Sequence, residues 1–249
     1  MEVHPLIRSL PVLLTALLGA LLVSLPPQAG AALPGAPTSG TPGEVVTGAS
    51  DTVLTPYGPL GKWMLDEGGQ PARWLGYQLE DRALREPVNL LLIDQAARTP
   101  QEAAARLLAA MSAAGYPARG GHSVGYRALI GAVTYPQQPA GKDEAFSDGA
   151  WWRANNHGRL FGPAPLPGGG YLWTGAFSRE KFTLISAMHH PYDSFRAARD
   201  NLTARLDAGG PFKRSATLSM DNALDTPSLT TDDHDGQAVV LIAARAPGF

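Results

Sequence analysis

Residues 88–93 read VNLLLI, a short and almost continuous apolar run that begins directly after Pro87. A run of this length, rich in aliphatic residues, is typical of a strand that is covered on both faces. The proline fits this interpretation, because a strand tolerates proline at its start. A second such run, AVVLIA, occupies residues 238–243 near the end of the chain. The two runs predict buried strands within a sheet.

Two amphipathic helices are predicted beside these strands. The first begins at the capping box Thr99-Pro100-Gln101-Glu102, which places proline at the first helical position, and ends at Gly115. Its apolar residues recur at helical spacing, at Ala104, Leu107, Leu108 and Met111. The second helix is expected at about 194–207, where Asp193 or Ser194 caps it and the Gly209-Gly210 pair ends it. Its core-facing residues are Phe195, Ala198, Leu202 and Leu206.

The remaining apolar segments are predicted to be extended. They lie at residues 126–135, 156–161, 171–177, 182–188 and 214–220. The glycines at 168–170 supply a turn between two of them. We therefore expect an α+β fold, in which two principal helices, at about 99–114 and 194–207, pack on a mainly antiparallel sheet.

Composition excludes several classes of site. The chain has 249 residues and no cysteine, so cysteine-ligated metal sites, disulfides and thiol nucleophiles are impossible. Its formal net charge is -2, which gives no electrostatic footprint for nucleic acid, and no nucleic-acid partner is expected. Hydrophobic residues make up 44% of the chain, which is enough for a buried core.

The N-terminal region resembles a targeting signal. An uncharged apolar run at 10–25 follows His4 and Arg8, and the small residues at 29–31 form a cleavage pattern. We predict a signal peptide at 1–31, a flexible linker rich in Pro, Gly and Ser at 32–52, and one globular domain at 53–249. The mature chain would then be periplasmic or extracellular, with no membrane span after cleavage. An uncleaved N-terminal anchor is the alternative.

The segment 155–163 (NNHGRLFGP) is the most unusual stretch of the sequence. Side chains alternate between the faces of a strand, so His157 and Arg159 are expected on the same face. A histidine can move a proton near neutral pH, and an arginine beside it can stabilise an anion. We predict His157, Arg159 and Glu180 as the candidate catalytic residues. In the structural alternative, Arg159 pairs with a carboxylate such as Glu180, and His157 bonds to a backbone carbonyl.

Further residues are candidates for binding a ligand. His122 lies in the glycine-flanked loop 120–126 (GGHSVGY), which either brings backbone close to a ligand or is a plain surface loop. Trp152, one of two adjacent tryptophans, could stack on a sugar or lipid. The other candidate ligand-binding residues are Asn155, Asn156, Trp173 and His190.

No metal or other cofactor is expected. His157, one of His189 and His190, and a carboxylate could form a three-ligand site, but no His-x-x-x-His or His-Glu-x-x-His spacing supports it. The acidic run at 232–235 (DDHD) lacks the pattern of a calcium loop and is interpreted as a solvated turn.

The order of motifs between about residues 87 and 243 resembles the LssY C-terminal-like domain family. The segments that carry the resemblance are Pro87-Val88-Asn89-Leu90, Ala114-Gly115-Tyr116, Asn156-His157-Gly158-Arg159-Leu160, Trp173, His189-His190, Arg199-Asp200-x-Leu202 and Thr231-Asp232-Asp233 with Gly236. The resemblance implies no particular activity. Such domains are often fused to a membrane-embedded phosphatase, whose place the predicted signal peptide and linker take here, so no phosphatase activity is inferred.

The sequence is compatible with three functions. The first is an exported binding or accessory domain for an envelope-associated or extracellular ligand, which predicts a pocket with a few convergent polar groups. The second is a hydrolase-like enzyme, with His157 as acid or base and Arg159 as stabiliser of an oxyanion. The third is a structural domain, in which the polar residues disperse into local ion pairs and caps. We take the first as the expected function and the hydrolase as its main alternative.

Overall fold

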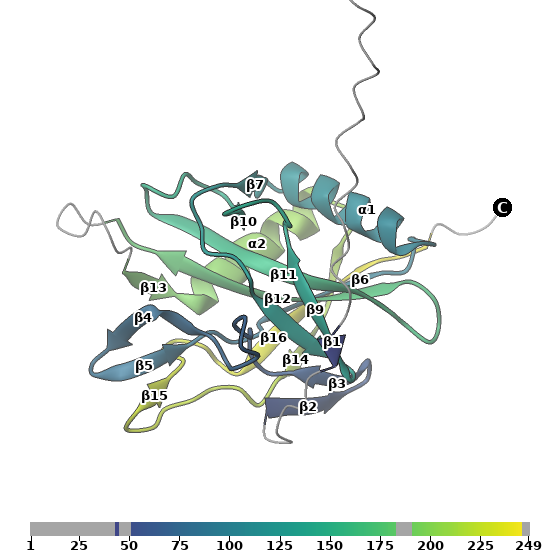
Figure 1. Ribbon diagram of the computed structural model, residues 1–249. Helices are drawn as coiled ribbons and strands as arrows, with labels where there is room; N and C mark the ends of the chain where they lie inside the picture. Colours follow the sequence, from purple (N-terminus) through teal and green to yellow (C-terminus); the bar gives the residue numbers. More distant parts are fainter. Residues whose placement is uncertain (1–42, 45–50, 183–190, 246–249) are drawn as a thin grey trace, which may run out of the picture. The chain divides into compact units, whose positions relative to one another are not determined.

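Strands are the main secondary structure of the protein (Figure 1). The structure is a computed structural model that describes residues 43–44, 51–182 and 191–245, all within the unit Ser39–Phe249. The main sheet has thirteen strands, and nine of them pair in the order β14 (Lys213–Ser219), β16 (Gln237–Ala243), β6 (Leu90–Asp94), β12 (Tyr171–Glu180), β11 (Asn155–Pro165), β9 (Val133–Gln138), β8 (Arg127–Ile130), β3 (Gly58–Gly61) and β2 (Thr52–Thr55). The other four lie off this path and are β1 (Gly43–Glu44), β7 (Ala118–Arg119), β10 (Ala145–Ser147) and β13 (Tyr192–Ser194).

A second, smaller sheet has three strands. Its order is β15 (Leu229–Thr230), β5 (Arg82–Arg85) and β4 (Arg73–Leu79). Strands β4 and β5 form an antiparallel hairpin, and β15 adds to β5 in parallel. This hairpin carries Arg73, Trp74 and Arg85.

The predicted α+β fold class is wrong. About 45% of the protein is strand and 16% is helix, and the large sheet forms a nearly closed, barrel-like arrangement. The helices α1 (Pro100–Ala113) and α2 (Phe195–Gly209) are present, but their side chains pack mainly into one core cluster of that sheet, and only Phe195 joins another. Apolar runs mark the long buried strands, whereas strands of two to four residues such as β2, β3 and β15 carry no periodic pattern. Sequence patterning therefore underestimates the strand content.

The two apolar runs form strands inside the main sheet, as predicted. Strands β6 and β16 pair in parallel. Leu90 and Leu92 of β6 point into the cluster that contains the helices, while Leu91 and Ile93 point into a second cluster on the opposite face. The prediction of a strand covered on both faces is therefore confirmed.

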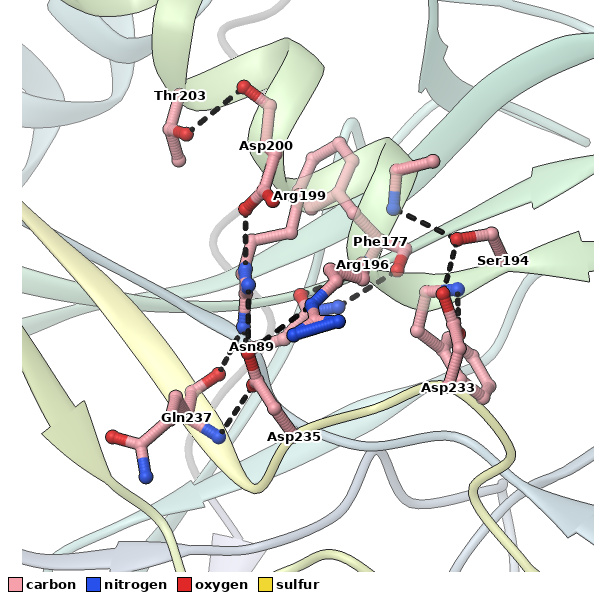
Figure 2. Close-up of polar contacts among 12 residues, drawn as sticks. Asn89, Phe177, Ser194, Arg196, Arg199, Asp200, Thr203, Asp233, Asp235 and Gln237 are labelled. Carbon is pink, nitrogen blue, oxygen red and sulfur yellow. Dashed lines mark hydrogen bonds and ion pairs between the residues drawn. The ribbon is translucent and has the colours of Figure 1, made fainter.

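The polar residue inside the first run has a specific role. Asn89 is fully buried, and its side-chain amide donates to the Phe177 carbonyl at 2.8 Å and accepts from the Phe177 amide at 3.1 Å (Figure 2). A buried amide that makes both bonds is satisfied. Asn89 thus continues the pairing between β6 and β12 just before β6 begins.

Both helices begin with the expected caps. Thr99 Oγ1 accepts from the Glu102 amide at 3.1 Å, and Ser194 Oγ accepts from the Ala197 amide at 2.8 Å. Asp233 adds to the second cap, because it accepts from the hydroxyls of Tyr192 and Ser194 (Figure 2). The predicted turn at 232–235 is present, and Asp232 and Asp235 are exposed, but Asp233 and the buried His234 are not solvated as expected.

Most other predicted strands are present. The segments 156–161 and 171–177 are parts of β11 and β12, and 214–220 corresponds to β14. The expected extended segment 126–135 is instead a hairpin of β8 and β9 that turns at Gly131, where φ is +66°. Glycine adopts this left-handed conformation without the steric cost that other residues have. The predicted strand 182–188 lies outside the described residues except for Phe182, which is not in a strand.

The predicted signal peptide at 1–31 and most of the linker at 32–52 lie outside the described residues. Within the predicted linker, Gly43–Glu44 forms β1 and pairs with β9. None of the helices in the described part of the chain is long and apolar enough to cross a membrane.

Candidate functional site

The pairing of β11 with β12 places the three candidate catalytic residues on one face. Asn155 lies opposite Glu180, and Arg159 lies opposite Ala176 two residues beyond His157. Directly opposed residues in an antiparallel pair point to the same side of the sheet. The side chains of Asn155, His157, Arg159 and Glu180 therefore project together, as the alternation of the strand predicts.

His157 is the centre of this group. Its Nε2 lies 3.6 Å from Glu180 Oε1, and the ring of His122 stacks on its ring at 4.8 Å between centroids. The indole of Trp74 lies 5.6 Å away on β4. His157, Glu180 and His122 are 4%, 5% and 8% exposed, so the cluster is almost closed to solvent.

Glu180 is held from its other side by an amide. Asn155 Nδ2 donates to Glu180 Oε2 at 3.3 Å, and Ser147 Oγ donates to Asn155 Oδ1 at 3.1 Å. Burial raises the pKa of Glu180 to about 7, although the bond from Asn155 and the charge of Arg159 both act to lower it. This carboxyl can therefore gain or lose a proton near neutral pH.

Arg159 is buried between a tyrosine, a loop and a second carboxyl. Its guanidinium carbon lies 4.6 Å from the centre of the Tyr126 ring, and Nη2 donates to the Ser123 carbonyl at 2.7 Å. Burial lowers the pKa of Arg159, while Glu86, Tyr126 and Glu180 act to raise it. The largest of these favourable charges is Glu86, which sequence analysis did not identify.

Glu86 follows β5 and is only 6% exposed. Burial raises the pKa of Glu86 to about 7, and the charge of Arg159 partly offsets this effect. No motif marks this residue, because its partner is 73 positions away and the two meet only through the fold.

The candidate loop at 120–126 does reach the cluster. His122 stacks on His157, and Ser123 and Tyr126 contact Arg159. At Gly121, φ is +93° and a Cβ atom would lie 2.4 Å from the Trp151 ring. A side chain there would clash, so glycine is required for the loop to pass beneath this tryptophan.

Four candidate ligand-binding residues are not placed in the cluster. Asn156 points to the opposite face of β11, where its amide nitrogen donates to Asp148 Oδ2 at 2.7 Å. Trp173 is fully buried in the core cluster that contains the helices. Trp152 is 54% exposed and packs against Trp151. His190 lies outside the described residues.

A cleft of about 440 Å³ borders the cluster. The two share Tyr126, whose ring lies against Arg159. The residues that line the cleft are Asp66, Gln70, Pro71, Ala72, Arg73, Arg85 and Tyr126. Unlike the cluster, this cleft is open to solvent and can accept a small molecule.

Two arginines meet in this cleft. Arg73 on β4 and Arg85 on β5 are directly opposite each other in the hairpin. Burial lowers the pKa of Arg85, the charge of Asp51 raises it, and the charge of Arg73 lowers it again. Arg85 stacks on Trp63 at 5.2 Å, and its buried Nε has no hydrogen-bond partner among the described residues.

Within the described part of the chain, no three residues of the types His, Cys, Asp or Glu are grouped so as to hold a metal ion. Comparisons with protein-family models, with curated proteins and with solved structures found no match to this chain. The resemblance to LssY C-terminal-like domains therefore stays a prediction.

The two buried carboxyls predict an unusual dependence of stability on pH. A carboxyl whose pKa is raised in the folded state binds more protons there than in the unfolded state. Its contribution to folding stability is therefore complete below pH 4.5 and is lost as the pH rises to about 7. Between pH 4 and 8, we expect the Glu86→Gln protein to lose about 3 kcal/mol less free energy of unfolding than the wild type, because the amide stays neutral at every pH. Urea denaturation at several pH values between 4 and 8 measures the effect.

The control for this experiment is Glu67→Gln, since Glu67 is an exposed residue. It should leave the shape of the pH curve unchanged. His234 acts in the opposite direction between pH 4 and 6.5, because burial lowers its pKa to about 4. The contribution of His234 to the free energy of unfolding is the same in the wild-type, Glu86→Gln and Glu67→Gln proteins, so it cancels when their curves are subtracted. Parallel curves for the wild-type and Glu86→Gln proteins would contradict the prediction.

Proposed function

We propose that the protein is an exported binding domain that recognises a small anionic ligand with Arg73 and Arg85. The observation that carries the proposal is the direct opposition of these two cations across the β4–β5 hairpin, in a cleft of about 440 Å³. Like charges directly opposite each other destabilise a strand pair. A carboxylate, phosphate or sulfate bound between them would replace this repulsion by two attractive contacts.

The chemistry of the cleft favours an anion over a neutral ligand. Guanidinium groups bind planar or tetrahedral oxyanions through pairs of hydrogen bonds. Among the described residues that line the cleft, Asp66 is the only acidic one, and its Oδ1 accepts from the Gln70 amide in its own turn. The buried Arg159 behind Tyr126 adds positive charge, which Glu86 offsets according to its protonation.

The location in the proposal rests on the sequence. The apolar run at 10–25 and the small residues at 29–31 support export to the periplasm or the exterior. The motif order between 87 and 243 supports a relationship to LssY C-terminal-like domains. An envelope-associated or extracellular anion is the ligand class that fits both the location and the cleft.

Titration calorimetry of the full chain tests the proposal, with inorganic phosphate and citrate as probes at constant ionic strength. We expect Arg73→Gln and Arg85→Gln each to weaken the Kd about tenfold or more, since each removes a charge-assisted contact. The matched control is Arg82→Gln on the same strand, because Arg82 pairs with the exposed Asp225 and does not line the cleft. Absence of binding, or an equal loss in the control, would overturn the proposal.

A hydrolase-like activity is the second candidate function. It is favoured by one observation, the 3.6 Å approach of His157 to a carboxyl with a pKa near 7. Both groups are about 5% exposed, so a substrate would reach them only after the covering loop opened. Hydrolysis of a chromogenic ester or phosphate by the wild-type chain, abolished by His157→Gln, would establish this activity in place of simple binding.

A further inference from the structure

A second cleft lies at the end of the central strands and shares no residue with the arginine cleft. Its volume is about 730 Å³, within the range of small-molecule sites. Four segments form it: the β2–β3 turn, the end of β6, the β11–β12 turn and the end of β16. The lining residues are Pro56, Tyr57, Gly58, Ile93, Gln95, Leu166, Pro167, Gly168, Gly169, Ile242 and Arg245.

The wall of this cleft is an extension of the core. Tyr57, Leu166 and Ile242 are partly buried and pack against the cluster that contains Leu91 and Ile93. Ile93 and Ile242 are paired neighbours on the parallel strands β6 and β16. Apolar groups of a ligand placed here would contact side chains that are only partly covered, and removal of this surface from water would favour binding.

The cleft has a single charged group, and it is a cation. Arg245 is the only charged residue among those that line it. Its Nε donates to the Gln95 carbonyl at 3.4 Å, and it forms no ion pair with any residue that the structure describes. A guanidinium in this state can still bind an anionic group with its remaining donors.

The nearest acidic residue along the strand is not available to neutralise this charge. Asp94 is fully buried, and its Oδ2 accepts from Arg106 of α1 at 2.6 Å. Its Oδ1 accepts from the amides of Ala96 and Ala97. Both oxygens of the Asp94 carboxylate are therefore hydrogen-bonded on the helix side of β6. They do not neutralise the charge of Arg245 in the cleft.

We propose that this cleft binds a free amphipathic anion, namely an aliphatic carboxylate of medium chain length. The alkyl chain would lie against Tyr57, Leu166 and Ile242, and the carboxylate would contact Arg245. The proposal does not depend on the anion site at Arg73 and Arg85, because the two clefts have no residue in common.

Calorimetry of the full chain tests both halves of this chemistry. The probes are hexanoate and octanoate below their micelle concentrations, with acetate and octanol as partial ligands. Each methylene that the cleft buries should strengthen binding about fourfold, so octanoate should bind roughly fifteenfold more tightly than hexanoate. Acetate lacks the chain and octanol lacks the charge, and both should bind more weakly than octanoate. Equal binding of octanol and octanoate would overturn the role of Arg245.

Two variants and one control locate the site. Arg245→Gln should weaken octanoate binding roughly threefold to tenfold, because it removes an exposed charge contact. Leu166→Gln should weaken it by a similar factor by removing apolar contact. Arg214→Gln, an exposed arginine on β14 outside the cleft, should have no effect. Should Leu166→Gln fail to fold, Arg245→Gln and the chain-length series still decide the question.

Amide chemical shifts give an independent readout of location. On addition of octanoate, we expect the largest changes at Ile93, Gln95 and Ile242. Changes confined to Arg73 and Arg85, or no change with octanoate at millimolar concentration, would overturn the proposal. A variant that lacks residues 246–249 provides one more test. If it binds octanoate more than tenfold more tightly than the full chain, residues 246–249 compete for the cleft, and the proposal of a free ligand is overturned.

Discussion

Replacement of Arg199 by methionine is expected to destabilise the protein by about 2–3 kcal/mol, because it removes charged hydrogen bonds to a carboxylate that is itself partly exposed. Arg199 lies on α2 and is 5% exposed. Its guanidinium donates to both carboxylate oxygens of Asp235, at 2.6 and 3.0 Å, and to the Gln237 carbonyl at 3.0 Å (Figure 2). These bonds join α2 to the start of β16, one of the central strands. Methionine has a similar length but leaves the acceptors without their donor.

The state of Asp235 shows how strong this contact is. Burial alone would raise the pKa of Asp235, but the hydrogen bonds and charge of Arg199 lower it to about 2. A carboxyl with a lowered pKa stabilises the fold above its unfolded pKa of 3.8, and that contribution is lost as the pH falls toward 2. We expect the Arg199→Met protein to lose most of this acid dependence, which urea denaturation between pH 2 and 5 measures.

Arg196 provides a matched control on the same helix. It approaches the same carboxylate of Asp235 at 3.5 Å, but its side chain is 54% exposed. Exposed pairs contribute little, so Arg196→Met should cost less than about 1 kcal/mol. Similar losses in the two variants would contradict a special role for the buried arginine.

The central strands and helix starts could be predicted because their determinants are local. The run at 88–93 and the capping box at Thr99 each act through neighbours in the sequence. The curvature of the sheet could not be predicted in this way. It depends on short strands such as β2 and β3, whose stability comes from partners far along the chain rather than from a pattern of their own. The predicted fold class was therefore wrong, although many of the predicted strands and helices are present.

The same distinction between local and long-range determinants applies to the candidate site. Alternation along one strand correctly placed His157 beside Arg159, and the strand opposite it brought Glu180 to the same face. Glu86 and the Arg73–Arg85 pair were not predicted, because their positions at the site depend on which strands pair and in which register. Trp173, a candidate ligand-binding residue, is fully buried in a core cluster. A tryptophan on a strand fits a binding site and a core equally well until its neighbours are known.

Replacement of Trp173 by alanine is expected to cost about 3–5 kcal/mol, because it leaves a large cavity in the core. The indole is fully buried between the main sheet and the helices, in the cluster that includes Leu107 of α1 and Leu202 of α2. If Trp173 bound a ligand instead, the same change would reduce binding while leaving stability almost intact. Urea denaturation and phosphate titration of the same variant separate these outcomes.

Trp173→Phe sharpens the argument, because it retains most of the buried volume. The indole nitrogen of Trp173 is buried and has no hydrogen-bond partner among the described residues. Phenylalanine removes this unsatisfied donor, which offsets part of the lost contact, so the variant should cost less than about 1.5 kcal/mol. Anion binding should be unchanged in both variants once they are folded, since Trp173 faces away from the arginine cleft. Weaker anion binding in a fully folded Trp173→Phe protein would instead mean that the two faces of the sheet are coupled, and the separation of core from binding site would have to be abandoned.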